Sequence, residues 1–219
     1  MSGKRIFLIH VTPVAVQPIN EAFARLWPEA LVSNLLDDSL SSDLARDGRL
    51  SESMKSRFLV LARYAAQSGA DGILFTCSAF GEAIEQCQRE LLIPVLKPNE
   101  AMIDEAVAQA SRITIVATFA PAVDSMVEEF NEAARRNGRP LALNAIVCPA
   151  ALDALRSGDA ALHDRLIRDR VETFEGSELI CFAQFSMVDA AVQARSATPI
   201  RILTTPDSAV LRLRAALES

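Results

Sequence analysis

The fold of this 219-residue chain is decided by the stretch "GILFTCSAFGE", Gly72–Glu82. A short apolar run, Ile73–Phe75, ends in Thr-Cys-Ser and is followed by a predicted helix that begins near Ala79. The stretch "ELICFAQFSM", Glu178–Met187, has the same order with other residues. Short apolar strands that lead directly into helices are typical of parallel sheets buried on both faces.

These two stretches belong to a repeat that spans the chain. Four pairs of landmarks are each separated by 105 to 108 positions, which indicates two halves with the same order of elements. The pairs are Ile6 and Ile113, Pro13 and Pro121, Gly72 and Glu178, and Pro94 and Pro199. The sequence therefore predicts an internal duplication with a pseudo-twofold relation between the halves.

Eight apolar runs alternate with amphipathic segments, such as Met54–Ala66 and Val123–Ala134, whose apolar residues recur at helical spacing. The predicted strands are Arg5–Ile9, Ala30–Leu35, Gly72–Phe75, Val95–Leu96, Ile113–Ala117, Leu141–Val147, Glu178–Phe182 and Ile200–Leu203. This alternation predicts an α/β protein of two similar flavodoxin-like or Rossmann-like domains with parallel sheets and a ligand cleft between them.

The domain boundaries follow from the same repeat. Residues 1–98 form the first predicted domain, together with a C-terminal helix at 206–219, and residues 99–205 form the second. A crossing helix is predicted over Lys97–Ser111, with Asn99 as its N-cap.

Composition narrows the class of protein. Half of the residues are hydrophobic, 5% are aromatic, the net charge is −6, and no basic block suggests a nucleic-acid or membrane-surface partner. The N-terminal apolar run is interrupted by His10 and ends at Pro13, so it is too short for the apolar region of a signal peptide. No apolar run approaches the length needed to span a membrane. We therefore expect a cytoplasmic protein.

The motifs present favour neither a metal nor a nucleotide cofactor. The four cysteines form no CxxC pair and no metal-ligand spacing with the two histidines, and the chain has no glycine-rich phosphate-binding fingerprint. We expect free thiols, no metal and no cofactor.

Candidate site residues lie where the predicted strands end, because ligands of open parallel sheets bind beyond the carboxyl ends of the strands. Several of these loops offer hydroxyl groups close to helix N-termini, which suit a carboxylate. Cys77 is the candidate catalytic residue, and the candidate substrate-binding residues are His10, Thr12, Thr76, Ser78, Ala79, Thr118, Gln184 and Ser186.

The duplicated order, "TCSA" in the first half and "FAQFSM" in the second resemble the Asp/Glu/hydantoin racemase superfamily, which includes arylmalonate decarboxylase and maleate isomerase. As architecture, the resemblance covers nearly the whole chain. It implies cofactor-free chemistry in which one thiolate removes the proton alpha to a carboxylate and a second thiol protonates the opposite face. The first family cysteine matches Cys77, and Gln184 stands in the loop that normally carries the second.

This departure leaves the reaction open. Glutamine cannot exchange a proton near neutral pH, and Cys181 could replace the missing thiol only if its strand ended earlier than predicted. One thiol with a lowered pKa at a helix N-terminus would suit one-sided proton delivery or nucleophilic addition. The favoured hypothesis is an isomerase of racemase type, followed by a decarboxylase, that acts on a small carboxylic acid.

The alternative hypothesis is a carboxylate-binding protein that keeps the cleft and has lost turnover. Other residues have simpler structural interpretations: Cys87 and Cys148 as core, Asp37 and Asp38 as a polar turn, and His163 as a solvated residue of the charged helix Asp159–Thr173. The substrate is not determined at this stage, and both a monomer and a homo-oligomer stay open.

Overall fold

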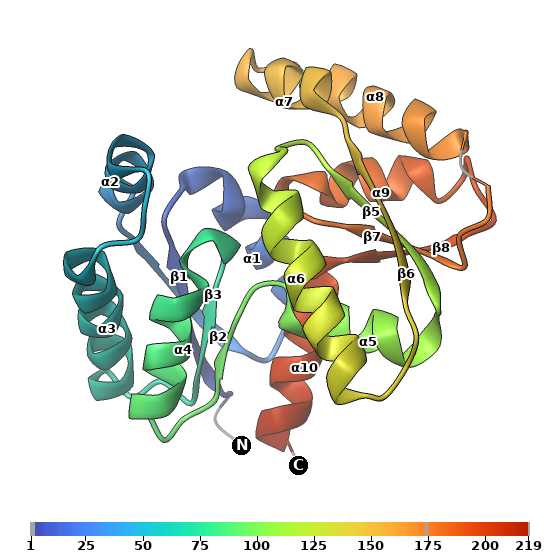
Figure 1. Cartoon of the computed structure of the whole chain (residues 1–219). Helices are drawn as coiled ribbons and strands as arrows, with labels where there is room; N and C mark the ends of the chain where they lie inside the picture. Colours follow the sequence, from blue (N-terminus) through green and yellow to red (C-terminus); the bar gives the residue numbers. More distant parts are fainter. Residues whose placement is uncertain (1–2, 174, 219) are drawn as a thin grey trace. The chain divides into compact units, whose positions relative to one another are not determined.

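The computed structural model describes residues 3–173 and 175–218. They divide into two compact units (Figure 1). Unit 1 consists of the described residues up to Pro98 and those from Ala209 onward, and unit 2 consists of Asn99–Ser208. Each unit contains one four-stranded parallel sheet flanked by helices, which confirms the predicted α/β class with two parallel sheets.

The sheet of unit 1 has the strand order β2-β1-β3-β4. Its strands are β1 (Arg5–His10), β2 (Leu31–Leu36), β3 (Gly72–Phe75) and β4 (Val95–Leu96). Its helical segments are η1 (Pro13–Ala15), α1 (Val16–Leu26), α2 (Ser39–Asp47), α3 (Glu52–Gln67), η2 (Ser78–Phe80) and α4 (Gly81–Glu90). Each predicted strand of this unit lies within one residue of the observed one.

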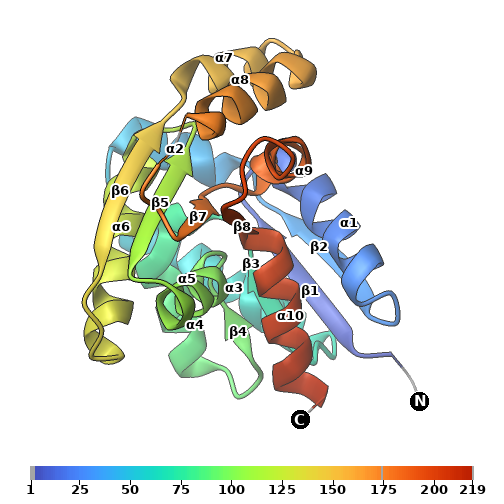
Figure 2. The ribbon, with the colours of Figure 1, turned by 90° about the vertical axis from the view of Figure 1, so that its right-hand side faces the viewer.

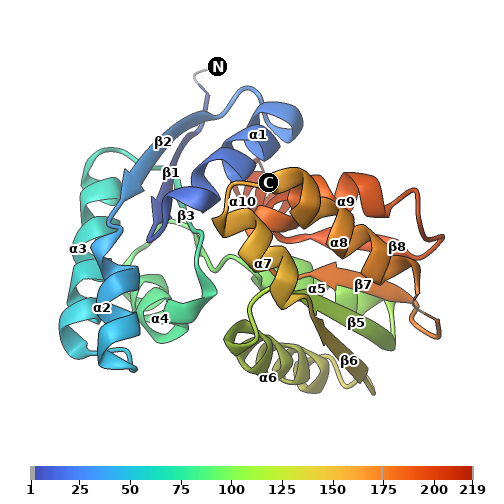
Figure 3. The same ribbon diagram turned by 90° about the horizontal axis from the view of Figure 1, so that it is seen from above.

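One face of this sheet is covered by α2, α3 and α4, as Figure 3 shows. The side chain of Ser51 caps α3 by accepting a hydrogen bond from the backbone N–H of Met54, at 3.3 Å. Phe58 of α3 then stacks on Phe75 and Phe80, with ring centroids 5.2 and 4.6 Å apart. These two rings lie at the end of β3 and in η2, so the α3 packing holds both sides of the loop that contains Cys77.

The other face of the unit 1 sheet carries α1 and α10 (Thr205–Glu218). Figure 2 shows that β8 leads directly into α10. Leu213 and Leu217 of α10 lie 3.0 and 3.1 Å from the place where Gly72 would carry a Cβ, so the helix packs closely on β3 because that residue is glycine. Arg214 also donates a hydrogen bond to the carbonyl oxygen of Leu26, at 3.0 Å.

The sheet of unit 2 has the equivalent order, β6-β5-β7-β8. Its strands are β5 (Arg112–Ala117), β6 (Ala142–Val147), β7 (Leu179–Phe182) and β8 (Arg201–Thr204). Its helical segments are α5 (Glu100–Gln109), α6 (Pro121–Arg136), α7 (Pro149–Arg156), α8 (Ala160–Glu172), η3 (Phe185–Met187) and α9 (Val188–Ala194). Apolar residues of α5 and α6 fill one face of this sheet, and those of α7, α8 and α9 fill the other.

The duplication is visible in the topology. In each sheet the first strand lies between the second and the third, and β7 follows β3 by 107 positions (179 − 72). In both units the third strand is followed by two residues and then by a short 3-10 turn. The two halves therefore place equivalent residues at equivalent ends of their sheets.

One expectation about an individual residue was wrong. His163 is not solvated: it is 1% exposed, because it lies on the face of α8 that packs into the unit, and its Nδ1 lies 2.8 Å from Oδ1 of Asp164. Asn99 is the N-cap residue of α5, as expected, although its side chain makes no capping hydrogen bond.

Candidate functional site

The loop after β3 carries the candidate catalytic cysteine. Cys77 precedes η2 with φ −136° and ψ 124°, which is extended backbone. Thr76, before it, donates a backbone hydrogen bond to the carbonyl oxygen of Ile9 in β1, at 3.1 Å. Ser78 is partly exposed and Ala79 is exposed, so this loop presents a thiol, a hydroxyl and backbone groups at the carboxyl edge of the sheet.

Cys77 differs from the other three cysteines in its exposure. It is partly exposed, while Cys87, Cys148 and Cys181 are buried. Burial raises the pKa of Cys87 to about 11 and that of Cys148 above its ordinary value. The core interpretation of Cys87 and Cys148 agrees with this placement.

The expected lowering of the Cys77 pKa was wrong. Protein atoms around the thiol raise its pKa by desolvation, and this effect exceeds the lowering that comes from a hydrogen bond with the backbone N–H of Ala79. The short turn η2 separates Cys77 from α4, so the helix N-terminus begins four residues beyond the thiol. Cys77 therefore carries its proton at neutral pH.

His10 ends β1 and is fully buried beside this loop. Its Nδ1 lies 2.8 Å from Oγ1 of Thr76, and its Nε2 lies 2.8 Å from Oδ1 of Asn34 in β2. Asn34 exchanges two hydrogen bonds with Asn20 of α1, at 3.1 and 3.3 Å. Desolvation lowers the pKa of His10, which keeps the ring neutral.

Asn20 and Asn34 were missed in the sequence. The available signal was the polar pair Ser33-Asn34, which interrupts the predicted apolar run Ala30–Leu35. A strand next to the first strand can bring such a residue to the polar group that ends its neighbour.

The equivalent loop of unit 2 contains Gln184. It precedes η3 with φ −133° and ψ 145°, close to the values of Cys77 before η2. Its side-chain Oε1 accepts hydrogen bonds from the backbone N–H and the hydroxyl of Thr118, at 2.6 and 2.9 Å. Within the described part of the chain its amide Nε2 has no partner, so the fixed side chain offers two N–H donors to a ligand.

Cys181 cannot take the place of a second thiol in this loop. It lies inside β7, paired with Ile115 and Leu203, and is fully buried. β7 continues to Phe182, so the strand does not end early. Burial also raises the Cys181 pKa far above its ordinary value.

Two further candidates lie near helical turns. Thr12 is the N-cap residue of η1, and Ser186 lies within η3, and both are partly exposed. The side chain of Thr12 makes no capping hydrogen bond, so its hydroxyl is not used by the turn. Unit 1 thus groups His10, Thr12, Thr76, Cys77, Ser78 and Ala79 at one sheet edge, and unit 2 groups Thr118, Gln184 and Ser186 at the equivalent edge.

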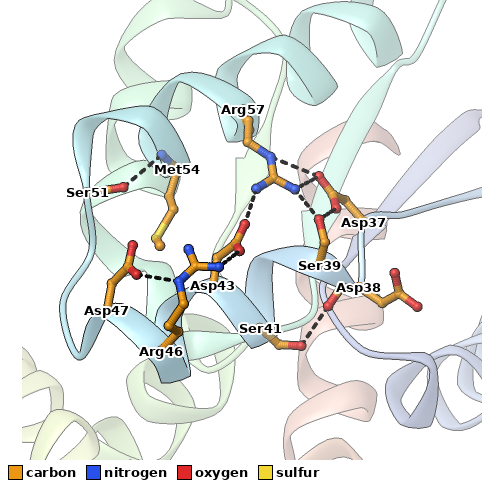
Figure 4. Close-up of polar contacts among 10 residues, drawn as sticks. All are labelled: Asp37, Asp38, Ser39, Ser41, Asp43, Arg46, Asp47, Ser51, Met54 and Arg57. Atoms are coloured by element: carbon orange, nitrogen blue, oxygen red, sulfur yellow. Dashed lines mark hydrogen bonds and ion pairs between the residues drawn. The ribbon is translucent and has the colours of Figure 1, made fainter.

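Asp37 and Asp38 follow β2 in a turn, as expected. Figure 4 shows that Arg57 of α3 reaches both Asp37 and Asp43, at 2.5 and 2.6 Å. This ion-pair network ties α2 to α3. Burial raises the pKa of Asp37, but hydrogen bonds from Ser39 and Arg57 outweigh that effect and lower the pKa. The acidic pair is therefore part of the scaffold of unit 1.

No group of three or more His, Cys, Asp or Glu side chains in the described chain is arranged to hold a metal ion. None of the described helices has the length and apolar character that crossing a membrane requires.

The strand order, the duplication and the strand-end loops define a two-unit α/β protein with polar loops at the carboxyl ends of its strands, the edge at which open parallel sheets bind ligands. Residues 12–213 match the sequence profile of the Asp/Glu/Hydantoin racemase family. Because this match covers most of the chain, the protein belongs to the Asp/Glu/hydantoin racemase family.

Solved structures of racemases have the same fold. A glutamate racemase from Bacillus anthracis aligns with a TM-score of 0.76 at 13% identity, covering 100% of this chain and 83% of that one. An allantoin racemase from Klebsiella pneumoniae aligns at 0.74 and 18% identity, covering 99% and 88%. An aspartate racemase homologue from Pyrococcus horikoshii aligns at 0.73 and 15% identity, covering 99% and 100%. Among curated proteins there is no sequence match.

Proposed function

We propose that this protein is a cofactor-independent enzyme that acts at or near the alpha carbon of a small carboxylic acid, with Cys77 as its acid/base or nucleophilic residue. The observation that carries the proposal is the position of Cys77. It is the only partly exposed thiol of the four cysteines, and it lies on the strand-end loop equivalent to that of Gln184.

Neutral donors would bind the substrate in this proposal. The loops at 10–14, 76–80, 117–121 and 183–187 contain no Lys or Arg. A carboxylate would therefore accept hydrogen bonds from backbone N–H groups, from the hydroxyls of Thr12, Ser78 and Ser186, and from Nε2 of Gln184. The same donors would stabilise the negative charge of an enediolate as it forms.

The protonation state of Cys77 favours the role of proton donor. Its raised pKa keeps hydrogen on Sγ at neutral pH. In the proposed step the S–H bond breaks, the proton goes to the alpha carbon of the enediolate, and the electron pair of the enediolate forms the new C–H bond. The thiolate left behind accepts the N–H of Ala79 and is then reprotonated by water.

A single acid fits two outcomes. In an isomerase, the proton lost from the alpha carbon goes to a solvent water, since the amide of Gln184 cannot accept it, and Cys77 delivers a proton to the opposite face. In a decarboxylase, the alpha carbon loses CO₂, the bonding electrons stay in the enediolate, and Cys77 supplies the replacing proton. We place the isomerase first and the decarboxylase second.

A carboxylate-binding protein without turnover is the second candidate. The observation that favours it is the anchored Gln184 at the position equivalent to Cys77. Its Oε1 already accepts two hydrogen bonds, so only its N–H groups are left to interact with a ligand. Such a site binds an anion and leaves only one group that could exchange a proton.

Exchange of alpha hydrogen in D₂O tests the proposal. Wild type, Cys77→Ser and the control Cys148→Ser are incubated with amino acids, hydantoins and malonates, and NMR records deuterium incorporation and CO₂ loss. Cys148 is the N-cap residue of α7, where serine is favoured, so the control keeps the fold. We expect turnover by wild type and by the control, and none by Cys77→Ser.

The other outcomes separate the candidates. Saturable binding without exchange in wild type supports the binding protein, and unchanged turnover by Cys77→Ser refutes the role of Cys77. The cytoplasmic location and the oligomeric state stay predictions, and cell fractionation and sedimentation measure them.

A further inference from the structure

We propose that Asn20, Asn34, His10 and Thr76 form a hydrogen-bond chain that positions Cys77, and that His10 acts through Thr76 without contacting the substrate. The chain runs from the exposed Asn34 and the half-buried Asn20 to the buried His10 and Thr76. Any role of this hydrogen-bond chain in catalysis rests on the proposed function. The effect of the chain on the Cys77 thiol is independent of the proposed function, because all of these residues belong to unit 1.

The direction of every hydrogen bond in the chain follows from one backbone carbonyl. Asn20 donates through Nδ2 to the carbonyl oxygen of Val16, at 2.6 Å, which fixes which end of its amide is nitrogen. The same Nδ2 donates to Oδ1 of Asn34 at 3.1 Å, and Oδ1 of Asn20 accepts from Nδ2 of Asn34 at 3.3 Å. The amide of Asn34 is therefore oriented by α1.

The orientation of Asn34 sets the tautomer of His10. The amide oxygen of Asn34 can only accept, so Nε2 of His10, 2.8 Å away, carries the hydrogen. Burial lowers the pKa of His10, so the ring is neutral and Nδ1 is an acceptor. The hydroxyl of Thr76 lies 2.8 Å from Nδ1 and 3.4 Å from the carbonyl oxygen of Ile9, so its single hydrogen goes to the nearer acceptor, Nδ1.

Thr76 is held to β1 at two points as a result. Its hydroxyl donates to His10, and its backbone N–H donates to the carbonyl oxygen of Ile9 at 3.1 Å. Because Thr76 and Cys77 are consecutive, these bonds fix the peptide group that joins them. The thiol of Cys77 is thereby kept in place to interact with the N–H of Ala79.

A direct substrate contact by His10 is the competing explanation. Both ring nitrogens already have partners, and the side chain has no exposed surface. A contact through Nδ1 would break the buried hydrogen bond with Thr76 and leave the Thr76 hydroxyl without that partner, and a contact through Nε2 would break the part-buried hydrogen bond with Asn34. Positioning needs no such change.

A matched pair of variants at Thr76 tests the chain. Thr76→Val removes the hydroxyl with little change in shape, and Thr76→Ser keeps it. We measure the rate of Cys77 alkylation by iodoacetamide against pH, with mass spectrometry to distinguish the four thiols. Loss of the N–H interaction on sulfur raises the apparent pKa, so we expect alkylation at pH 8 to fall roughly tenfold in Thr76→Val, about one pKa unit, and to change less than about twofold in Thr76→Ser.

The tautomer is a second, independent readout. The ¹⁵N shifts of His10 in wild type should show a protonated Nε2 and a bare Nδ1, and Asn20→Ala, which frees the amide of Asn34 to turn, should populate both tautomers. This variant is remote from the Cys77 loop and keeps the test valid if Thr76→Val is poorly folded. A protonated Nδ1 in wild type, or equal alkylation of the Val and Ser variants, overturns the proposal.

These readouts also separate this proposal from the proposed function. If no substrate turns over but the tautomer and the alkylation rates behave as expected, the chain positions Cys77 and the enzymatic proposal alone fails. If an active substrate is found, Thr76→Val should lower kcat and leave KM within about twofold, since neither His10 nor the lost hydroxyl binds substrate in this proposal.

Discussion

Truncation of Phe58 tests whether the packing of α3 supports the Cys77 loop. Phe58 is 1% exposed and stacks on Phe75 at 5.2 Å and on Phe80 at 4.6 Å, with ring planes 22° and 26° apart. Truncation of a buried phenylalanine to alanine costs roughly 3–5 kcal/mol of unfolding free energy. Two stacked pairs contribute about 0.5–1.5 kcal/mol each, which places Phe58→Ala in the upper half of that range.

The control for this experiment is Phe130→Ala. Phe130 is fully buried in α6 of unit 2 and has no stacked aromatic partner among the described residues. We expect it to cost roughly 3–4 kcal/mol, slightly less than Phe58→Ala. Urea and thermal unfolding measure both, and each kcal/mol corresponds to a fall in Tm of about 2–4 °C for a chain of this size.

Hydrogen exchange then locates the effect. Phe75 and Phe80 flank the Cys77 loop, so Phe58→Ala should speed amide exchange over residues 76–80, while Phe130→Ala should leave those amides unchanged. A loss below about 1.5 kcal/mol in Phe58→Ala, or equal exchange at 76–80 in the two variants, would refute the claim that this aromatic cluster holds the loop.

Three further predictions concern single residues. The pKa of His10 is lowered in the folded protein, so its contribution to stability is retained above about pH 6.5 and lost as pH falls through the folded pKa. Urea denaturation at pH 7 and at pH 5 should therefore show a smaller loss of unfolding free energy in His10→Gln than in wild type. An equal loss in the two proteins contradicts this prediction. Cys181→Ser places a hydroxyl in the apolar interior around β7 and should cost about 1–3 kcal/mol in urea unfolding without altering alpha-hydrogen exchange, whereas loss of exchange in folded protein would make it a functional thiol. Gln184→Glu keeps the acceptor for Thr118 and removes the N–H donors, so carboxylate affinity measured by calorimetry should fall at least tenfold, and unchanged affinity would exclude Gln184 as a ligand donor.

The residues that could be predicted from sequence are those whose position follows from the chain order. Gly72–Phe75 was predicted with its observed bounds, and the run ending at Phe182 was misplaced by one residue at its start. Apolar strands followed directly by helices restrict topology strongly, because parallel pairing and right-handed crossovers leave few alternatives. The placement of Cys77 and Gln184 at equivalent strand ends follows from that order.

Electrostatics and side-chain partners could not be predicted in this way. The sequence suggested a lowered pKa for Cys77 from a nearby helix, but the 3-10 turn Ser78–Phe80 intervenes and burial dominates. His163 lies in a charged segment of sequence, yet it faces the interior because helical spacing places it one and two turns before Ile167 and Val171. Both errors concern the surroundings of a side chain in three dimensions.

The amino-acid sequence by itself determined the α/β class, the internal duplication, the family and the loops in which chemistry is to be sought, because hydrophobic periodicity and residue order are local or repeat along the chain. Only the tertiary structure decided that Asn20, Asn34, His10 and Thr76 form one chain of hydrogen bonds, and that Oε1 of Gln184 is held by Thr118. Those residues come from different strands and helices. Their contacts, and the desolvation that sets the pKa of His10 and Cys77, exist only after the sheets have brought distant segments together.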